Sequence, residues 1–127
     1  MTFLEKVLNY YNLSNEDYLN LTRSLSLADI RNPYDFKGMK EAKEIVLDAL
    51  KNNEKIMVYG DYDTDGITST SIIVKTFLYL DKVVGYYVPS RYIDGYGLNL
   101  SRAKEIVNKK YNLVILVDNG VCALDAI

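Results

Sequence analysis

The chain has 127 residues, of which 49% are hydrophobic and 25% are charged, which is ordinary for a globular domain with a hydrophobic core. It contains no histidine, and this absence excludes Ser-His-Asp and Cys-His catalysis as well as zinc sites built on histidine. The net charge of −2 lacks the basic surplus that is typical of proteins binding nucleic acid through phosphate contacts alone.

Helical spacing characterises the first third of the chain. Apolar residues at 4, 7, 8 and 11 predict a short amphipathic helix, and Ser14 with Asp17 predicts a capping box that begins a second one. The Asn32-Pro33 pair interrupts this pattern, because the residue before a proline is disfavoured in the helical conformation. A stripe of apolar residues predicts a longer helix over 39–50. We expect residues 1–54 to form a helical N-terminal lead-in.

Strand and helix patterns alternate after residue 54. The sequence predicts strands at 55–59, 83–88 and 113–117, separated by helices around 72–80 and 103–107. Such alternation is typical of right-handed crossovers, so the fold class we expect is α/β, with a parallel Rossmann-like sheet and flanking helices. Residues 121–127 resemble the opening of a further helix, and we therefore expect an incomplete domain.

Polar residues follow each predicted strand. The groups that we expect to meet along one edge of the sheet are Asp61, Asp63, Asp65, Ser90, Arg91, Asp118 and Asn119. Clustered carboxylates repel one another unless a cation neutralises them, and their oxygens favour magnesium, manganese or calcium. An acidic turn that caps the next helix is the simpler alternative. Thr68, Ser69 or Thr70 is expected to cap that helix, whose free N–H groups suit a phosphate.

Two known motifs overlap the acidic stretch. Asp61-x-Asp63-x-Asp65-Gly66 matches the start of an EF-hand loop, but that loop requires a glutamate where this chain has Ile72, and it follows a helix rather than a strand. The EF-hand interpretation is therefore rejected. The stretch 63–66 also resembles the nucleophile motif of haloacid-dehalogenase-like phosphatases, whose pattern normally continues with threonine where this chain has Ile67. This phosphatase remains an alternative.

A third resemblance extends over most of the chain. Residues 58–70 resemble the first motif of the DHH phosphoesterase family in its RecJ form almost residue for residue, and the likeness continues in order at 88–91, 94–99 and 117–120. Residues 55–127 would then be the N-terminal part of a DHH domain. The Asp-His-His motif that names the family is expected beyond Asp118, so the chain resembles a truncated piece of the domain.

The resemblance implies a two-metal site, usually with manganese and otherwise magnesium, that activates water to attack a phosphodiester. By position in the motifs, Asp63, Asp65 and Asp118 would be the metal-binding and catalytic residues. Asp61 would shape the site or contact the metal indirectly. Tyr59 stands where the broader family often has a histidine ligand, and RecJ-like members tolerate residues other than histidine at this position.

The resemblance also implies residues that contact the substrate. Arg91 would contact a phosphate, and Tyr96 would stack on a base, although an exposed ion-paired arginine and a packed tyrosine are the alternatives. Thr68 and Ser69, near the start of the helix after the acidic stretch, complete the expected substrate-binding set.

The function implied for the parent protein is 5′-3′ exonuclease activity on single-stranded DNA in repair and recombination. We expect a fragment of this length to be inactive alone and to bind metal weakly. Two alternatives belong to the same family: a phosphodiesterase acting on oligoribonucleotides or cyclic dinucleotides, and a degenerate domain that serves as a binding scaffold.

The remaining expectations concern location and assembly. Cys122 is the single cysteine, the N-terminus does not resemble a signal peptide, and the apolar runs are short, so we expect a cytoplasmic protein with no membrane partner. An unfinished sheet would leave an edge strand exposed, and this edge can pair with a second copy of the fragment.

Overall fold

The computed structural model describes residues 1–126, and the chain divides into two compact units, Met1–Lys37 and Gly38–Ile127. The first unit contains the helices α1 (Phe3–Tyr10) and α2 (Asn15–Thr22). The single-turn 3₁₀ helices η1 (Leu27–Asp29) and η2 (Pro33–Asp35) follow them. The predicted capping box of α2 is confirmed, because the Ser14 hydroxyl accepts from the Asp17 amide at 3.1 Å and the Asp17 carboxylate accepts from the Ser14 amide at 2.8 Å.

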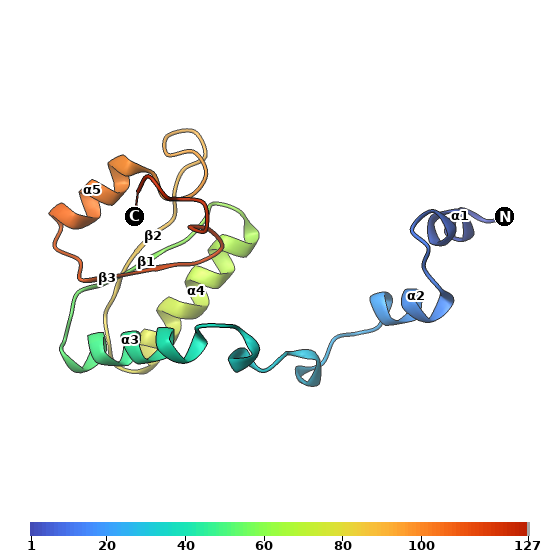
Figure 1. The fold of residues 1–127 in the computed structure, drawn as a ribbon, viewed down its shortest axis with the longest axis horizontal. Coiled ribbons are helices and arrows are strands. Elements are labelled where there is room, and N and C mark those ends of the chain that lie inside the picture. Colours follow the sequence, from blue (N-terminus) through green and yellow to red (C-terminus); the bar gives the residue numbers. More distant parts are fainter. Residues whose placement is uncertain (127) are drawn as a thin grey trace. The chain divides into compact units, whose positions relative to one another are not determined.

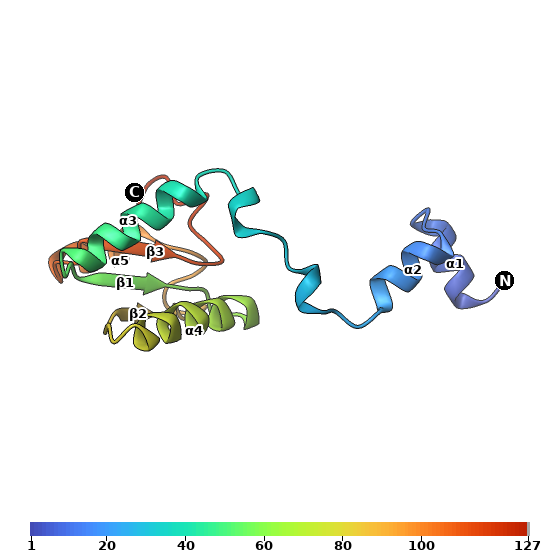
Figure 2. The ribbon, with the colours of Figure 1, turned by 90° about the horizontal axis from the view of Figure 1, so that it is seen from below.

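The second unit is an α/β structure, as predicted. Its elements in chain order are α3 (Met39–Lys51), β1 (Ile56–Tyr59), α4 (Thr64–Tyr79), β2 (Gly85–Tyr87), α5 (Leu100–Asn108) and β3 (Leu113–Leu116). The strands form a parallel sheet in the order β2-β1-β3, with β1 in the middle (Figures 1 and 2). Tyr59, the last residue of β1, pairs with Tyr87 and Leu116, the last residues of its two neighbours. The loops that leave the three strands therefore start at the same edge of the sheet.

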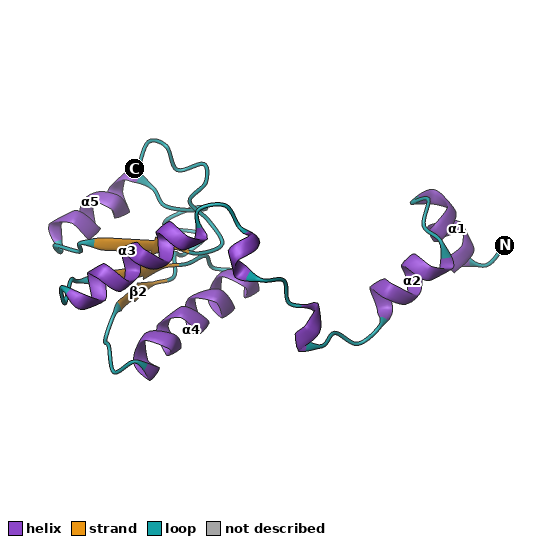
Figure 3. Ribbon diagram, turned by 60° about the horizontal axis from the view of Figure 1, so that its bottom comes forward, coloured by secondary structure: helices purple, strands orange, loops and turns teal. Residues whose placement is uncertain are grey.

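The core lies on both faces of β1, whose four residues are all buried. On one face Ile56 and Val58 pack with Ala49 of α3 and Phe77 of α4. On the opposite face Met57 and Tyr59 pack with Ile106 of α5. Figure 3 shows α3 and α4 together on the first face of the strands. Helix α3, which the sequence placed in the lead-in, thus contributes to the core of the second unit.

Two expectations about helix ends are wrong. Helix α4 begins at Thr64 and its N-cap is Asp63, not Thr68, Ser69 or Thr70. The apolar spacing that predicted this helix starts later, because its first turn consists of polar residues at the edge of the sheet. Residues 121–126 form turns rather than the start of a helix, with a hydrogen bond of 3.1 Å from the Ala123 amide to the Gly120 carbonyl. Residue 127 lies outside the described residues.

The helices in the described part of the chain are all too short or too polar to cross a membrane.

Candidate metal centre

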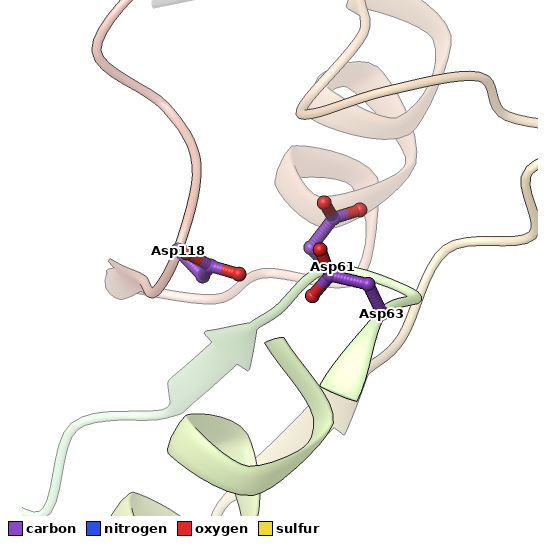
Figure 4. A group of neighbouring side chains, drawn as sticks. All are labelled: Asp61, Asp63 and Asp118. Atoms are coloured by element: carbon purple, nitrogen blue, oxygen red, sulfur yellow. The ribbon is translucent and has the colours of Figure 1, made fainter. Parts of the chain in front are cut away.

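Three carboxylates meet where β1 and β3 end. Asp61, Asp63 and Asp118 each offer one oxygen, and these oxygens all lie within 4.8 Å of one another. Figure 4 shows the carboxylate of Asp118 pointing toward those of Asp61 and Asp63. Asp61 and Asp63 come from the loop after β1, and Asp118 comes from the loop after β3. The aligned ends of the parallel strands thus bring together residues that are far apart in the sequence, as predicted.

The two aspartates of the first loop are fixed by their backbone surroundings. The side chain of Asp61 is 1% exposed, and it accepts a hydrogen bond from the Tyr62 amide at 2.8 Å. Asp63 is the N-cap of α4, because its Oδ1 accepts from the Gly66 amide at 3.0 Å. The backbone of Gly66 lies against that of Asp61 so closely that a Cβ on Gly66 would be 2.5 Å from the Asp61 carbonyl oxygen. The loop therefore has little freedom to move relative to α4.

Asn119 connects the two loops of the centre. Its Nδ2 donates to the Gly60 carbonyl at 2.8 Å and to the Val117 carbonyl at 2.9 Å. These carbonyls immediately precede Asp61 and Asp118 in the chain. One side chain thus fixes the distance between the strand ends that carry the carboxylates, and the buried Oδ1 of the same amide has no protein partner among the described residues.

The electrostatics of the centre favour a cation. Desolvation and the negative charge of Asp63 raise the pKa of Asp118 above its ordinary value, and the charges of Asp65 and Asp61 act in the same direction. The neighbouring negative charges disfavour the ionised form of Asp118, and a divalent ion bound between these oxygens would remove that repulsion.

Removing the charge of Asp118 is expected to stabilise the metal-free chain at neutral pH. Because the folded-state pKa of Asp118 is raised, its negative charge destabilises the folded chain. This destabilisation is fully present above the folded-state pKa and absent below the unfolded-state pKa of about 4. The melting temperature of Asp118→Asn in chelator should therefore exceed that of the wild type at pH 7, and the difference should shrink as the pH falls toward about 4. With manganese added, the order should reverse, since the variant has lost a ligand. A variant that melts below the wild type in chelator at pH 7 would contradict this account.

The donor set fits a hard divalent ion. All three groups are carboxylates, which suit magnesium, manganese and calcium. Two oxygens bound to one ion at about 2.1–2.5 Å lie at most about 4–5 Å apart, so the observed separations require little rearrangement. Among the described residues, Asp61, Asp63 and Asp118 can thus hold such an ion together.

The other expected residues of the first motif lie in α4. Asp65 is in the first turn of this helix and is not part of the three-carboxylate group, although its charge contributes to the raised pKa of Asp118. The hydroxyl of Thr68 donates to the Thr64 carbonyl at 2.7 Å, and that of Ser69 donates to the Asp65 carbonyl at 2.6 Å. Both hydroxyl protons are therefore engaged within the helix, and only the oxygen lone pairs remain available to a ligand.

The two expected substrate contacts after β2 lie near the centre. The guanidinium carbon of Arg91 is 5.8 Å from the centroid of the Tyr62 ring, so Arg91 lies beside the acidic loop. The hydroxyl of Tyr96 donates to the Asp118 carbonyl at 3.4 Å. Desolvation and the charges of Asp61 and Asp118 raise the pKa of Tyr96, which therefore stays protonated at neutral pH.

A cavity of about 520 Å³ opens beside Asp118, and a volume of this size accommodates a small ligand. Its lining comes from the segments 96–98 and 118–123 and includes Tyr96 and Cys122. The sequence indicated neither this cavity nor the place of Cys122, because both depend on how two loops approach each other.

Tyr59 has a structural role that the sequence did not reveal. Its ring stacks on that of Tyr87 with centroids 5.4 Å apart, and its hydroxyl donates to the Gly97 carbonyl at 3.1 Å. Desolvation, with the negative charge of Asp94, raises the pKa of Tyr59 to about 12. This tyrosine therefore holds the loop after β2 through a neutral hydroxyl, rather than offering a ligand to a metal.

Comparison with known proteins gives consistent matches. The sequence model described as "DHH family, N-terminal domain" matches residues 55–127. The single-stranded-DNA-specific exonuclease RecJ of Bacillus subtilis is 43% identical over 97 residues, which is 76% of this chain but 12% of that protein. The chain thus spans about an eighth of this relative.

Two solved structures resemble the chain. A crystal structure of exonuclease RecJ bound to manganese covers 67% of this chain and 22% of its own, with 36% identity and a TM-score of 0.63. The crystal structure of RecJ from Thermus thermophilus in complex with Mn²⁺ covers 83% and 14% respectively, with 28% identity and a TM-score of 0.62. Both neighbours contain the hard divalent ion that the carboxylates of this chain suit.

Proposed function

This chain belongs to the DHH family, in its RecJ-type branch, and from that premise we propose that the complete protein is a metal-dependent exonuclease that degrades single-stranded DNA from its 5′ end. DNA repair and recombination are the processes that such an activity serves, and the cytoplasm is the compartment. The family membership also sets aside the haloacid-dehalogenase-like alternative. Residues 1–54 would be a lead-in, and residues 55–127 the first part of the DHH domain, where the family model begins to match.

The observation that carries this proposal is the meeting of Asp118 with Asp61 and Asp63 at one edge of the sheet. A divalent ion, when bound, supplies Lewis acidity and lowers the pKa of a water molecule. The carboxylates hold that charge in place, and the bonds from Asn119 to both strand ends keep their spacing before any substrate arrives. Such preorganisation is what hydrolysis of a phosphodiester requires.

The residues divide into two proposed roles. Asp63, Asp65 and Asp118 would be the metal-binding and catalytic residues, and Asp61, which is buried within the cluster, would join them directly or through water. Asp65 lies outside the three-carboxylate group, in the first turn of α4, and would join the site as an additional ligand.

The substrate contacts come from the two neighbouring loops. Arg91, beside the acidic loop, offers a positive charge to a phosphate, and Tyr96, next to Asp118, offers a ring on which a base can stack. Thr68 and Ser69, in the first turns of α4, would accept hydrogen bonds from N–H groups of a base through their hydroxyl oxygens, and the positive end of the helix would attract a phosphate.

The proposal is tested with the complete protein encoded by the reading frame that carries this chain. Single-stranded and double-stranded DNA of the same sequence, labelled at either end, would be incubated with manganese or with chelator. We expect mononucleotides from the 5′ end of the single strand only, and only with metal. Release from short RNA or hydrolysis of cyclic dinucleotides, with DNA left intact, would transfer the proposal to another DHH phosphodiesterase. Binding without any hydrolysis would favour a degenerate scaffold.

A further inference from the structure

The loop of residues 90–98 passes the carboxylate cluster without regular secondary structure. It joins β2 to α5, and its outward side chains are exposed, including Tyr92 at 97% and Tyr96 at 69%. Gly95 and Gly97 adopt positive φ angles of 76° and 74°, which glycine reaches without steric cost, and a Cβ added at either position would meet no atom within 4 Å. Packing at these two glycines therefore does not restrain the loop. A loop of this kind is flexible unless other contacts fix it.

A buried carboxylate inside the loop supplies those contacts. The side chain of Asp94 is 3% exposed, and it accepts from the Ser90 amide at 2.7 Å, from the Tyr87 hydroxyl at 3.0 Å and from Arg102 Nε at 2.6 Å. The Asp94 carbonyl also accepts from Asn99 Nδ2 at 2.9 Å. Donors from β2, from α5 and from the loop itself therefore converge on one residue.

The donors are themselves held by the sheet. The Arg102 guanidinium lies over the Tyr87 ring at 4.9 Å, and Tyr87 stacks on Tyr59, whose hydroxyl donates to the Gly97 carbonyl. The loop is thus fixed twice, at Asp94 and at Gly97, by neighbouring side chains that continue into the core. Burial alone would raise the pKa of Asp94, but its three donors outweigh that effect and lower the pKa, so the carboxylate stays charged.

We propose that Asp94 and Arg102 are positioning residues that hold the 90–98 loop so that Arg91 and Tyr96 are presented to single-stranded DNA at the carboxylate cluster. The inference rests on the proposed function and deepens it, because it names the residues that prepare the substrate-binding surface. A buried carboxylate with three donors restricts the loop before binding, and the loop then loses less conformational freedom when a ligand binds.

The test uses Asp94→Asn in the complete protein. The amide keeps the size of the carboxylate but loses its charge. We expect KM for single-stranded DNA to rise about 10-fold or more, with a smaller change in kcat and an unchanged manganese affinity in titration calorimetry. Trypsin should also cleave after Arg91 faster than in the wild type. The matched control is Glu105→Gln, which breaks the ion pairs of Glu105 with Arg102 and Lys109 but leaves the bond to Asp94, and it should behave as the wild type.

Each outcome distinguishes the inference from the proposed function. Faster cleavage after Arg91 with unchanged KM would overturn the positioning role, and so would a lower manganese affinity with unchanged KM. If the wild type does not degrade single-stranded DNA, the proposed function fails. The role of Asp94 in holding the loop is tested independently of DNA: trypsin cleavage after Arg91 that is slower in Asp94→Asn than in the wild type, or equally fast, would overturn it. Should Asp94→Asn fail to fold, Tyr87→Phe removes one donor alone, and a rise in KM in the same direction but smaller is then expected; an unchanged KM would overturn the inference.

Discussion

Replacing Asp63 with alanine is expected to lower nucleotide release by the complete protein more than about 100-fold, because even residues that only support a metal ligand are worth about 10–100-fold. The substitution removes two things at once. One is a carboxylate of the three-residue cluster, and the other is the hydrogen bond from the Gly66 amide that caps α4. Losing the cap should cost about 1 kcal/mol of stability in addition to the lost activity.

The companion variant Asp63→Asn separates these two roles. Asparagine caps helices as well as aspartate does, so the free energy of unfolding measured with urea should stay near the wild-type value. The negative charge is lost, however, and activity and manganese affinity should fall almost as far as in Asp63→Ala. Asp17→Ala, which removes a capping carboxylate from α2, is the control and should leave nuclease activity unchanged. Wild-type activity in Asp63→Asn would show that Asp63 serves the helix and not the metal.

The second large effect is expected for Gly66→Ala. Alanine usually stabilises a helix by up to about 1 kcal/mol relative to glycine. Here the added Cβ would lie 2.5 Å from the carbonyl oxygen and 2.6 Å from the Cα of Asp61, and these are backbone atoms of a tightly held loop. We therefore expect the opposite sign, a destabilisation of about 1–3 kcal/mol, because overpacking outweighs helix propensity.

The displacement of Asp61 should also weaken manganese binding, and titration of the same variant would detect it. Ser71→Ala, an exposed position on the same helix, is the control, and it should change the free energy of unfolding by no more than about 0.5 kcal/mol. A Gly66→Ala chain that is more stable than the wild type, with unchanged metal affinity, would show that the loop moves aside at no cost.

The sequence was sufficient to predict a parallel sheet and the edge at which its acidic residues meet. Alternating strand and helix patterns imply parallel strands, and parallel strands bring their carboxyl ends to one edge, so Asp63 and Asp118 were expected to meet. The resemblance placed Asp65 among the ligands and gave Asp61 a supporting role, whereas the three-carboxylate group contains Asp61 and not Asp65. These two residues lie on either side of Asp63, and which of them faces Asp118 depends on the turn between β1 and α4, which no periodicity encodes.

Some features depend on tertiary contacts that have no local signal. Metal binding and helix capping were treated as alternatives for the acidic stretch, although one oxygen of the Asp63 carboxylate can cap α4 and leave the other free for an ion. Helix α3 was placed in the lead-in because a new pattern begins after it, yet its apolar stripe packs on the sheet. The sequence likewise did not predict the partners of Asp94, because its hydrogen bond with Arg102 forms only when the loop packs against α5.

The bond from Asn119 to the Gly60 carbonyl joins residues 59 positions apart, and this has a consequence for the order of folding. During synthesis β1 emerges first, but the centre cannot exist until both crossovers are complete and β3 has paired beside it. Contacts so distant in sequence form slowly and late. A divalent ion that needs Asp118 as well as Asp63 therefore has little to bind in the folding transition state. It should slow unfolding much more than it accelerates folding, so that the ion prolongs the lifetime of the native state.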